Sequence, residues 1–587
     1  MNSSIPTPPS RISQVGAVTL TLCFALLATN ASFLIPVFET SDEREHLAVA
    51  RHWIQEGTLP NLTQMPRRAL DEGVQPPLAY WIFAGGMWLL DIEKTPFLSR
   101  PRPVEEITPA RPHLFDHGAD EVWPYEGDVL RFHLLRLINV IFGAATVFLT
   151  FHLARRIARH SEGLALGATA LVAFNPQFIF LCSGITNGPL AIALSTGALI
   201  LLADLAATPN PTDRQSIRLG LVIGAALLTK LSAIMLLPTA LAALLIGQRN
   251  HPSATRGFRN GFFLLVGALS LSGFWWVWNI YHYGDPFAWS VGQGKFGVER
   301  YAELGAANIS SGSAVLTRYL PRMVHSYAVS FGDKVDAGFW VALAYGVAVL
   351  GGLWGFARTL VRRSPNIAWG TVALLICALA VNQAAAIRFY LDFNQHQGRY
   401  LFPTIAVVAT LVALGWSALP RTRLKSVLIL LLGVITIHAE RSVLGPAFFP
   451  PSRQHDPYFA SIDHMKTIPA NRHAVTVKIT TPPLAGDIVH QTNAAPSIHW
   501  VTADLYHARY TVHVSVPGLS ASLKTYEMLG KSQFDRFQIP EDLWAEVPTD
   551  AVIQVQVVRL LSIERSQAPD ATVEESPVIL FRKSGPS

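Results

Sequence analysis

Apolar residues gather in runs of about twenty over the first three quarters of the chain, and charged residues fall mainly between these runs. A helix of that length crosses the hydrocarbon core of a bilayer, which is about 30 Å thick. The pattern therefore predicts a polytopic α-helical membrane protein. The eleven predicted spans lie at residues 15–37, 130–153, 163–182, 188–206, 216–229, 231–247, 261–281, 339–357, 367–387, 401–418 and 424–438.

Basic residues in the predicted loops indicate the orientation, because cytoplasmic loops are enriched in Lys and Arg. They are Arg11, Arg155, Arg156, Arg159, Arg214, Arg218, Arg249, Arg256, Arg259, Arg358, Arg362, Arg363, Arg421, Arg423 and Lys425. All of them share one side if the apolar segment 76–92 does not cross the membrane. We therefore predict an interfacial or re-entrant helix at 76–92. Lys230 then stands at the outer tip of a hairpin of two short spans, whereas one long kinked helix would invert the later loops.

This topology places two long loops and the C-terminal segment on the outer face. The loops are 38–128, which carries interfacial helices, and 282–338. The last part of the chain alternates apolar and polar residues, as at 510–516 and 552–558, which is typical of half-buried strands. We predict a membrane domain at 1–445 and an extracytoplasmic, β-sandwich-like domain at 451–587.

Composition agrees with a membrane protein and narrows the partners. Half of the 587 residues are apolar and 15% are charged, whereas soluble proteins carry about 25% charged residues. The formal net charge of +6 comes from Lys and Arg in short loops, so it does not predict nucleic-acid binding. Cys23, Cys182 and Cys377 all lie in or beside apolar segments and indicate no disulfide framework.

An acidic cluster, Thr40-Ser41-Asp42-Glu43-Arg44-Glu45-His46, directly follows the first span. Thr40 and Glu43 have the spacing of a capping box, so one interpretation is helix capping. If Glu43 folds back to cap, Asp42 is free to face a cavity, with His46 one helical turn further on the same face. A carboxylate at this place can act as a general base or hold a divalent metal.

Three further candidates lie where predicted spans begin at the outer surface, and each has an ordinary alternative. Asn187 is a good helix N-cap. Lys230 can snorkel to the interface. Arg399, which precedes Tyr400, can anchor a helix at the interface, or it can clamp a phosphate.

Five motifs occur in a fixed order: Asp42-Glu43, Pro76-Pro77-Leu78-Ala79-Tyr80-Trp81, Thr186-Asn187, Thr229-Lys230-Leu231-Ser232 and Gln397-Gly398-Arg399-Tyr400-Leu401-Phe402-Pro403. Over about residues 15–440 the chain thereby resembles the GT-C glycosyltransferases, which include protein O-mannosyltransferases and lipid A aminoarabinose transferases. The resemblance implies a polyprenyl-phosphate-linked sugar donor and inversion at the sugar carbon. It also implies a catalytic Asp in the first outer loop, which maps to Asp42, with Glu43 beside it, and phosphate-binding residues, which map to Lys230 and Arg399.

Two positions depart from the family pattern. Gly188 stands where relatives often carry a second acid, which puts a metal site shared between two outer loops in doubt. Gln75 stands before Pro76, where relatives can carry a charged residue.

The sequence thus predicts a membrane glycosyltransferase that acts on a glycan, lipid or protein acceptor. Asp42 and Glu43 are the predicted catalytic residues. The predicted substrate-binding residues are His46, Gln75, Asn187, Lys230, Arg399 and Tyr400. The sequence identifies no cofactor, and a divalent metal, if one binds, would be held by Asp42. We expect a bacterial inner membrane, with the site and the β domain outside the cytoplasm. The alternative is a non-catalytic protein that binds or transports a lipid-linked glycan.

Overall fold

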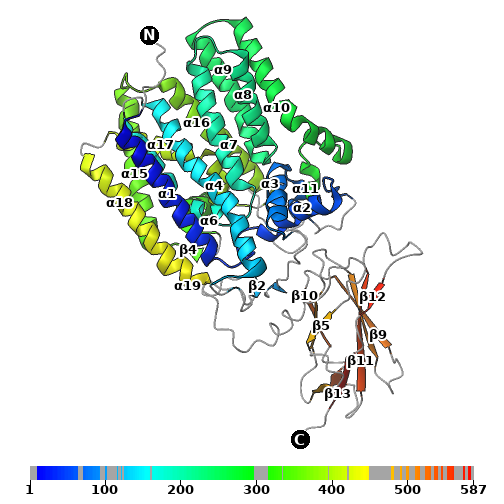
Figure 1. Ribbon diagram of the computed structural model, residues 1–587. Coiled ribbons are helices and arrows are strands. Elements are labelled where there is room, and N and C mark those ends of the chain that lie inside the picture. The colour runs from blue at the N-terminus through cyan, green and yellow to red at the C-terminus, as the bar shows by residue number, and fades with distance from the viewer. Residues whose placement is uncertain are drawn as a thin grey trace.

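The computed structural model shows a bundle of helices, with the C-terminal strands gathered apart from it (Figure 1). It describes residues 9–63, 70–92, 100–101, 115–116, 121, 124–158, 161–296, 315–332, 335–393, 395–418 and 422–448, together with short stretches between 478 and 583. The predicted domains 1–445 and 451–587 both include residues outside the described ranges. Parts of the predicted outer loops 38–128 and 282–338 also lie outside them.

The α-helices of the bundle are α1 (Arg11–Leu34), α2 (Glu43–Glu56), α3 (Leu78–Leu89), α4 (Gly127–Ile157), α5 (Glu162–Ala173), α6 (Pro176–Cys182), α7 (Gly188–Ala207), α8 (Asp213–Leu227), α9 (Leu236–Asn250), α10 (Ala254–Tyr283), α11 (Trp289–Phe296), α14 (Leu320–Ala328), α15 (Phe339–Arg362), α16 (Trp369–Phe393), α17 (Ile405–Trp416), α18 (Thr422–Ala439) and α19 (Gly445–Phe448). Short 3-10 helices are η1 (Asp71–Val74), η4 (Leu231–Met235) and η6 (Gly398–Thr404), and π-helical turns are η5 (Val315–Tyr319) and η7 (Glu440–Leu444). Two small hairpins pair β1 (Arg100–Pro101) with β2 (Phe115–Asp116), and β3 (Ser330–Phe331) with β4 (Val335–Asp336).

The predicted membrane character is confirmed, with a smaller number of long spans than the eleven predicted. Within the described residues nine helices are long and apolar enough to cross a membrane, and α5 with α6 would make a tenth although a 61° bend separates them. The bend has a local cause, because Pro176 cannot continue α5 and the Asn175 side chain accepts the N–H of Phe178 at 2.9 Å to begin α6. The remaining predicted span is α8, which has only 15 residues.

Two details of the predicted topology can be compared with the structure. The segment 76–92 forms α3, a helix of 12 residues that is too short to count among the spans. Lys230 stands between α8 and η4, and α8 and α9 both pack against α7, which is consistent with a hairpin that has Lys230 at its tip.

Contacts between the predicted cytoplasmic loops place them at one end of the bundle. Arg156 at the end of α4 forms an ion pair of 3.0 Å with Asp204 at the end of α7. Ala158 pairs with Ile367 across two loops, and Arg256 donates to the carbonyl of Pro209 at 2.6 Å. We call this end the basic end.

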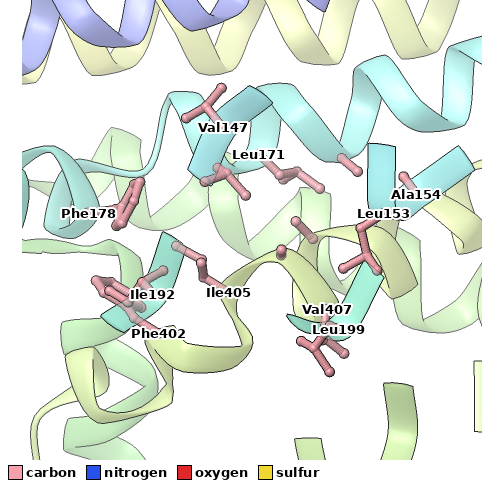
Figure 2. Packing of buried hydrophobic residues seen from close by; sticks show 14 of the residues in the cluster. Val147, Leu153, Ala154, Leu171, Phe178, Ile192, Leu199, Phe402, Ile405 and Val407 are labelled. Carbon is pink, nitrogen blue, oxygen red and sulfur yellow. The ribbon is translucent and has the colours of Figure 1, made fainter. Parts of the chain in front are cut away.

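The centre of the bundle is built around α4, which packs against α1, α5 and α7. Apolar side chains from α4, α5, α6, α7, η6 and α17 converge there, among them Val147, Leu171, Phe178, Ile192 and Phe402 (Figure 2). Because six elements share this packing, the loops at their ends are held in fixed relative positions. The candidate site lies on such loops, opposite the basic end.

Beyond residue 477 the described residues confirm strands but not a sandwich. They form a three-stranded sheet in the order β10 (Phe534–Gln538), β7 (Ser497–Val501), β5 (Lys478–Thr481). A second sheet has the order β6 (Val489–Gln491), β13 (Ile579–Lys583), β11 (Val552–Leu560), β8 (Arg509–Ser515), β9 (Leu523–Leu529), with β12 (Val573–Glu575) also paired to β11. The predicted strands at 510–516 and 552–558 correspond to β8 and β11, which pair antiparallel. A β-sandwich-like domain at 451–587 stays a prediction.

Candidate active site

Four segments far apart in the chain meet at the end of the bundle opposite the basic end. They bring together Asp42 before α2, Asn187 before α7, Lys230 before η4 and Arg399 in η6. Arg399 Nη2 donates to Asp42 Oδ2 at 2.9 Å, and Lys230 Nζ donates to Asn187 Oδ1 at 2.9 Å. The structure thus assembles four of the residues that the sequence singled out.

Asp42 is accessible and held in an uncommon backbone conformation. Its φ is +59°, in the left-handed region where Asp is tolerated better than most residues, and its carbonyl accepts the His46 N–H at 2.9 Å. Its side chain is 46% exposed, whereas that of Arg399 is 13% exposed. Burial by surrounding protein opposes ionisation, but the combined effect of Arg399, His46 and Lys230 is larger and lowers the pKa of Asp42. Asp42 is therefore an accessible carboxylate.

Glu43 does not cap α2. It is buried, and each of its oxygens accepts two hydrogen bonds. Oε1 accepts from Arg136 Nε at 2.7 Å and from the Ile185 N–H at 2.9 Å, while Oε2 accepts from Arg136 Nη2 at 2.6 Å and from the Phe38 N–H at 2.9 Å. Because both of its carboxylate oxygens already accept hydrogen bonds from buried groups, Glu43 is better placed for a structural role than for the predicted catalytic one.

The sequence interpretation missed two residues of α4 that hold the site loops. Arg136, which is fully buried, also donates to the carbonyls of Ser32, Ile35 and Pro36 at 2.6–2.7 Å. One turn further, Asn139 Nδ2 donates to the carbonyls of Gly184 and Thr186 at 2.7 and 2.9 Å. A charged Arg136 inside the predicted span 130–153 was the available signal, because an ionisable residue in a span normally has a partner.

A chain of hydrogen bonds through Tyr80 connects His46 with Lys230. The Tyr80 hydroxyl lies 3.0 Å from His46 Nδ1, and Asn187 Nδ2 donates to it at 3.5 Å. The Asn187 side chain does not cap α7, because it binds Tyr80 and Lys230 instead. Tyr80 belongs to the Pro-Pro-Leu-x-Tyr-Trp motif, and α3 is tied to the Lys230 turn because the Leu78 N–H donates to the Leu228 carbonyl at 2.9 Å.

Glu72 is an acidic residue of the site that the sequence interpretation did not select. Burial and the Asp42 charge raise the pKa of Glu72 to about 8, although Lys230 and Arg399 act in the opposite direction. Burial and the charge of Arg399 lower the pKa of Lys230 to about 8. At pH 7 Lys230 and Arg399 are therefore positive, Asp42 is negative, and Glu72 is neutral. These four groups together carry one excess positive charge, which favours an anionic ligand beside Arg399 and Lys230.

The other two predicted residues lie beside this cluster. Gln75 follows η1, and its N–H donates to the Glu72 carbonyl at 3.0 Å. The Tyr400 ring lies 5.6 Å from the Arg399 guanidinium carbon and 5.2 Å from the Phe389 ring. Tyr400 therefore packs beside Arg399.

The described residues do not offer a ligand set for the divalent metal considered above. Nowhere among them do three His, Cys, Asp or Glu side chains come together as a metal site. Asp42 Oδ2 already accepts from Arg399. A Cβ at Gly188 would meet Leu181 at 3.4 Å, so a side chain at that position would contact Leu181.

Residues 131–278 match the family model for dolichyl-phosphate-mannose-protein mannosyltransferase. This stretch includes Arg136, Asn187 and Lys230 but not Asp42 or Arg399. A search of curated protein sequences found no match.

Among solved structures the chain is similar to the Saccharomyces cerevisiae protein O-mannosyltransferase Pmt1-Pmt2 complex bound to the sugar donor. The identity is 16% and the TM-score 0.34, over 53% of this chain and 36% of that chain. It is also similar to ArnT from Cupriavidus metallidurans bound to undecaprenyl phosphate, with 13% identity and a TM-score of 0.34 over 72% of this chain and 78% of that chain. The arabinosyltransferase EmbB from Mycobacterium smegmatis has 11% identity and a TM-score of 0.40 over 99% of this chain and 65% of that chain.

The family match over residues 131–278 supports the predicted resemblance to membrane glycosyltransferases. The enzyme class of the whole chain stays a prediction. The chain spans about a third of the length of the mannosyltransferase chain that it matches. Its own donor, acceptor and mechanism are therefore matters of proposal.

Proposed function

We propose that this protein transfers a sugar from a polyprenyl-phosphate-linked donor to an extracytoplasmic acceptor, with inversion at the sugar carbon and with Asp42 as the general base. The observation that carries the proposal is the pairing of an accessible carboxylate with a cationic pair, Arg399 and Lys230. The name of the matching family, dolichyl-phosphate-mannose-protein mannosyltransferase, contains a donor of this kind, because dolichyl-phosphate-mannose is a polyprenyl-phosphate sugar.

The donor phosphate is bound by the two cations. Arg399 offers a planar guanidinium that can form two parallel hydrogen bonds to phosphate oxygens, and Lys230 adds a second positive charge. The excess positive charge of the site attracts the anion before contact. When the phosphate takes hydrogen bonds from Arg399, the ion pair with Asp42 weakens. Asp42 then loses a stabilising partner, and its pKa rises toward that of a useful base.

The transfer follows from this arrangement. An acceptor hydroxyl gives its proton to Asp42 while its oxygen attacks the sugar carbon from the face opposite the phosphate. The carbon–oxygen bond to phosphate breaks, and the electron pair leaves on the phosphate oxygen, where Arg399 and Lys230 stabilise the charge. A single attack from the opposite face inverts the configuration. Glu43 takes no part in these steps.

The acceptor is a glycan, a lipid or a protein, and it approaches from outside the cytoplasm. The support is the position of the site opposite the basic end, because basic loops are typically cytoplasmic. For a bacterial protein the membrane is then the inner membrane. The strands beyond residue 477 follow the last span, so we assign them to this same outer side.

The test follows the donor lipid in membranes that contain either the wild-type protein or Asp42→Asn. Mass spectrometry measures the loss of polyprenyl-phosphate sugar and the gain of free polyprenyl phosphate. Asn keeps the size of Asp and tolerates a positive φ, whereas it cannot act as a base, so turnover should fall roughly 10²- to 10⁴-fold. Binding of the donor should persist. Near wild-type turnover in Asp42→Asn would remove Asp42 from the role of base.

The same experiment separates the enzyme from a binding or transport protein. A transporter would move or retain the lipid-linked sugar without releasing free polyprenyl phosphate. If the wild-type protein copurifies with an intact lipid-linked glycan and never consumes it, the proposed transfer is wrong.

A further inference from the structure

His46 is a buried histidine that faces the site and has one ring nitrogen bound by protein. It is 2% exposed, lies one helical turn after Asp42 on α2, and stacks on Tyr80 with ring centroids 5.7 Å apart. Nδ1 lies 3.0 Å from the Tyr80 hydroxyl. The Nε2 atom makes no hydrogen bond to any residue that the structure describes. The ring therefore has one nitrogen available for a ligand.

The surroundings of Tyr80 decide which nitrogen carries the proton. The single Tyr80 hydroxyl proton can go to His46 Nδ1 at 3.0 Å or to the Glu72 carbonyl at 3.3 Å. The Glu72 carbonyl already accepts the Gln75 N–H at 3.0 Å, and Asn187 donates to the Tyr80 oxygen from another direction. The contact with His46 Nδ1 is the shorter one, and the Tyr80 oxygen already accepts from Asn187, so we take Tyr80 as the donor to His46 Nδ1. The His46 proton is then on Nε2.

The ring stays neutral at physiological pH. Burial lowers the pKa of His46 to about 3; Lys230 and Arg399 act in the same direction, whereas Asp42 opposes them. Burial raises the pKa of Tyr80 well above its usual value, so Tyr80 keeps its proton and remains a donor. These groups, with Glu72, are the charged and titratable groups recorded around the pair. His46 is thus an uncharged hydrogen-bond donor.

An uncharged donor suits an uncharged oxygen. The two cations of the site are sufficient for the phosphate, and the sugar must lie between the phosphate and the base Asp42. We propose that His46 Nε2–H donates a hydrogen bond to a hydroxyl of the donor sugar, with Tyr80 as the residue that sets its tautomer. This inference rests on the proposed function and deepens it, because it makes His46 a determinant of sugar recognition.

Binding to paired ligands tests the assignment. One probe is undecaprenyl phosphate, and the other is the same lipid carrying a sugar. Mannose, glucose and aminoarabinose are tried with the wild-type protein, and the sugar-bearing lipid that binds most tightly is then used for all variants. His46→Ala should weaken binding of the sugar-bearing lipid about five- to tenfold, the worth of one hydrogen bond, with less than about a twofold change for undecaprenyl phosphate. His46→Gln, which places a donor near the Nε2 position, should recover part of the loss.

Two variants serve as controls. Lys230→Ala should weaken both ligands, because it removes phosphate binding. His52→Ala changes another buried histidine of α2 and should weaken the binding of neither ligand.

Tyr80→Phe tests the role of Tyr80. It should weaken binding of the sugar-bearing lipid more than binding of undecaprenyl phosphate, because the His46 ring stays in place but its tautomer is no longer set by the Tyr80 hydroxyl.

The outcomes separate the inference from the proposed function. Failure of the wild-type protein to bind either lipid would contradict the proposed function. If both lipids bind and His46→Ala weakens them equally, or weakens neither, His46 does not contact the sugar and only the inference fails. Nitrogen NMR of labelled histidine, compared between wild type and His46→Gln, should show a neutral ring protonated at Nε2 from pH 5 to 8. A proton on Nδ1 would make Nε2 an acceptor and overturn the proposal.

Discussion

Replacing Glu43 by Gln tests the buried network that holds the first site loop. Gln has nearly the same shape, but one of its two ends is an NH2 group. Each end of the Glu43 carboxylate faces one Arg136 donor and one backbone N–H, at 2.6–2.9 Å. In either amide orientation the NH2 group therefore faces two donors, and Arg136 loses its charge partner.

The cost should be large, because both partners are buried. Arg136 is 0% and Glu43 1% exposed in the ion pair. Breaking a buried pair by removing one charge costs about 3–5 kcal/mol. In a capping box, the role suggested by the sequence, Gln serves in place of Glu, as Gln215 does for α8, so Glu43→Gln would then cost little. A large loss of stability therefore favours the buried ion pair over capping.

The assay is thermal unfolding of the purified full-length protein in detergent, followed by tryptophan fluorescence. Glu43→Gln should lower the midpoint by several degrees. The control is Asp128→Asn, which breaks an exposed ion pair of 3.1 Å with Arg131 on the same helix as Arg136. Such surface pairs are worth about 0.2–1 kcal/mol. A midpoint for Glu43→Gln no lower than that of Asp128→Asn would refute the structural role.

Further predictions concern the charges that bind the donor. Affinity for undecaprenyl phosphate should fall as pH rises through about 8, since Lys230 then loses its proton and Glu72 gains a negative charge; a flat profile from pH 6.5 to 9 would contradict both shifts. Glu72→Gln should be nearly silent at pH 7, where Glu72 is neutral, and should bind the lipid more tightly than wild type at pH 9. If it weakens binding at pH 7, Glu72 contributes a contact that Gln cannot replace. Arg399→Ala should weaken lipid binding more than Arg399→Lys does, because Lys keeps the charge. Equal affinities in wild type and both variants would make Arg399 only an interfacial anchor.

Comparison of sequence and structure at Glu43 and Asn187 shows where local patterns mislead. Both residues have the spacing or type of helix caps, and neither side chain caps its helix. Each instead binds partners more than forty positions away in the chain, Arg136 and Lys230 respectively. A capping motif reports only local spacing, whereas the competing long-range partner appears once the bundle has packed.

The sequence alone determined that this is a membrane protein, because the length and apolarity of each helix can be read locally and can be compared directly with the thickness of the bilayer. It also indicated Asp42, because a carboxylate is costly near a membrane without a function, whereas the resemblance to the GT-C glycosyltransferases indicated Lys230 and Arg399. Only the tertiary structure decided that Arg399 pairs with Asp42, that Glu72 joins the site, and that burial beside Tyr80 lowers the pKa of His46. Protonation and pairing depend on distances between segments far apart in the chain, and the packing of six elements around the bundle centre sets those distances.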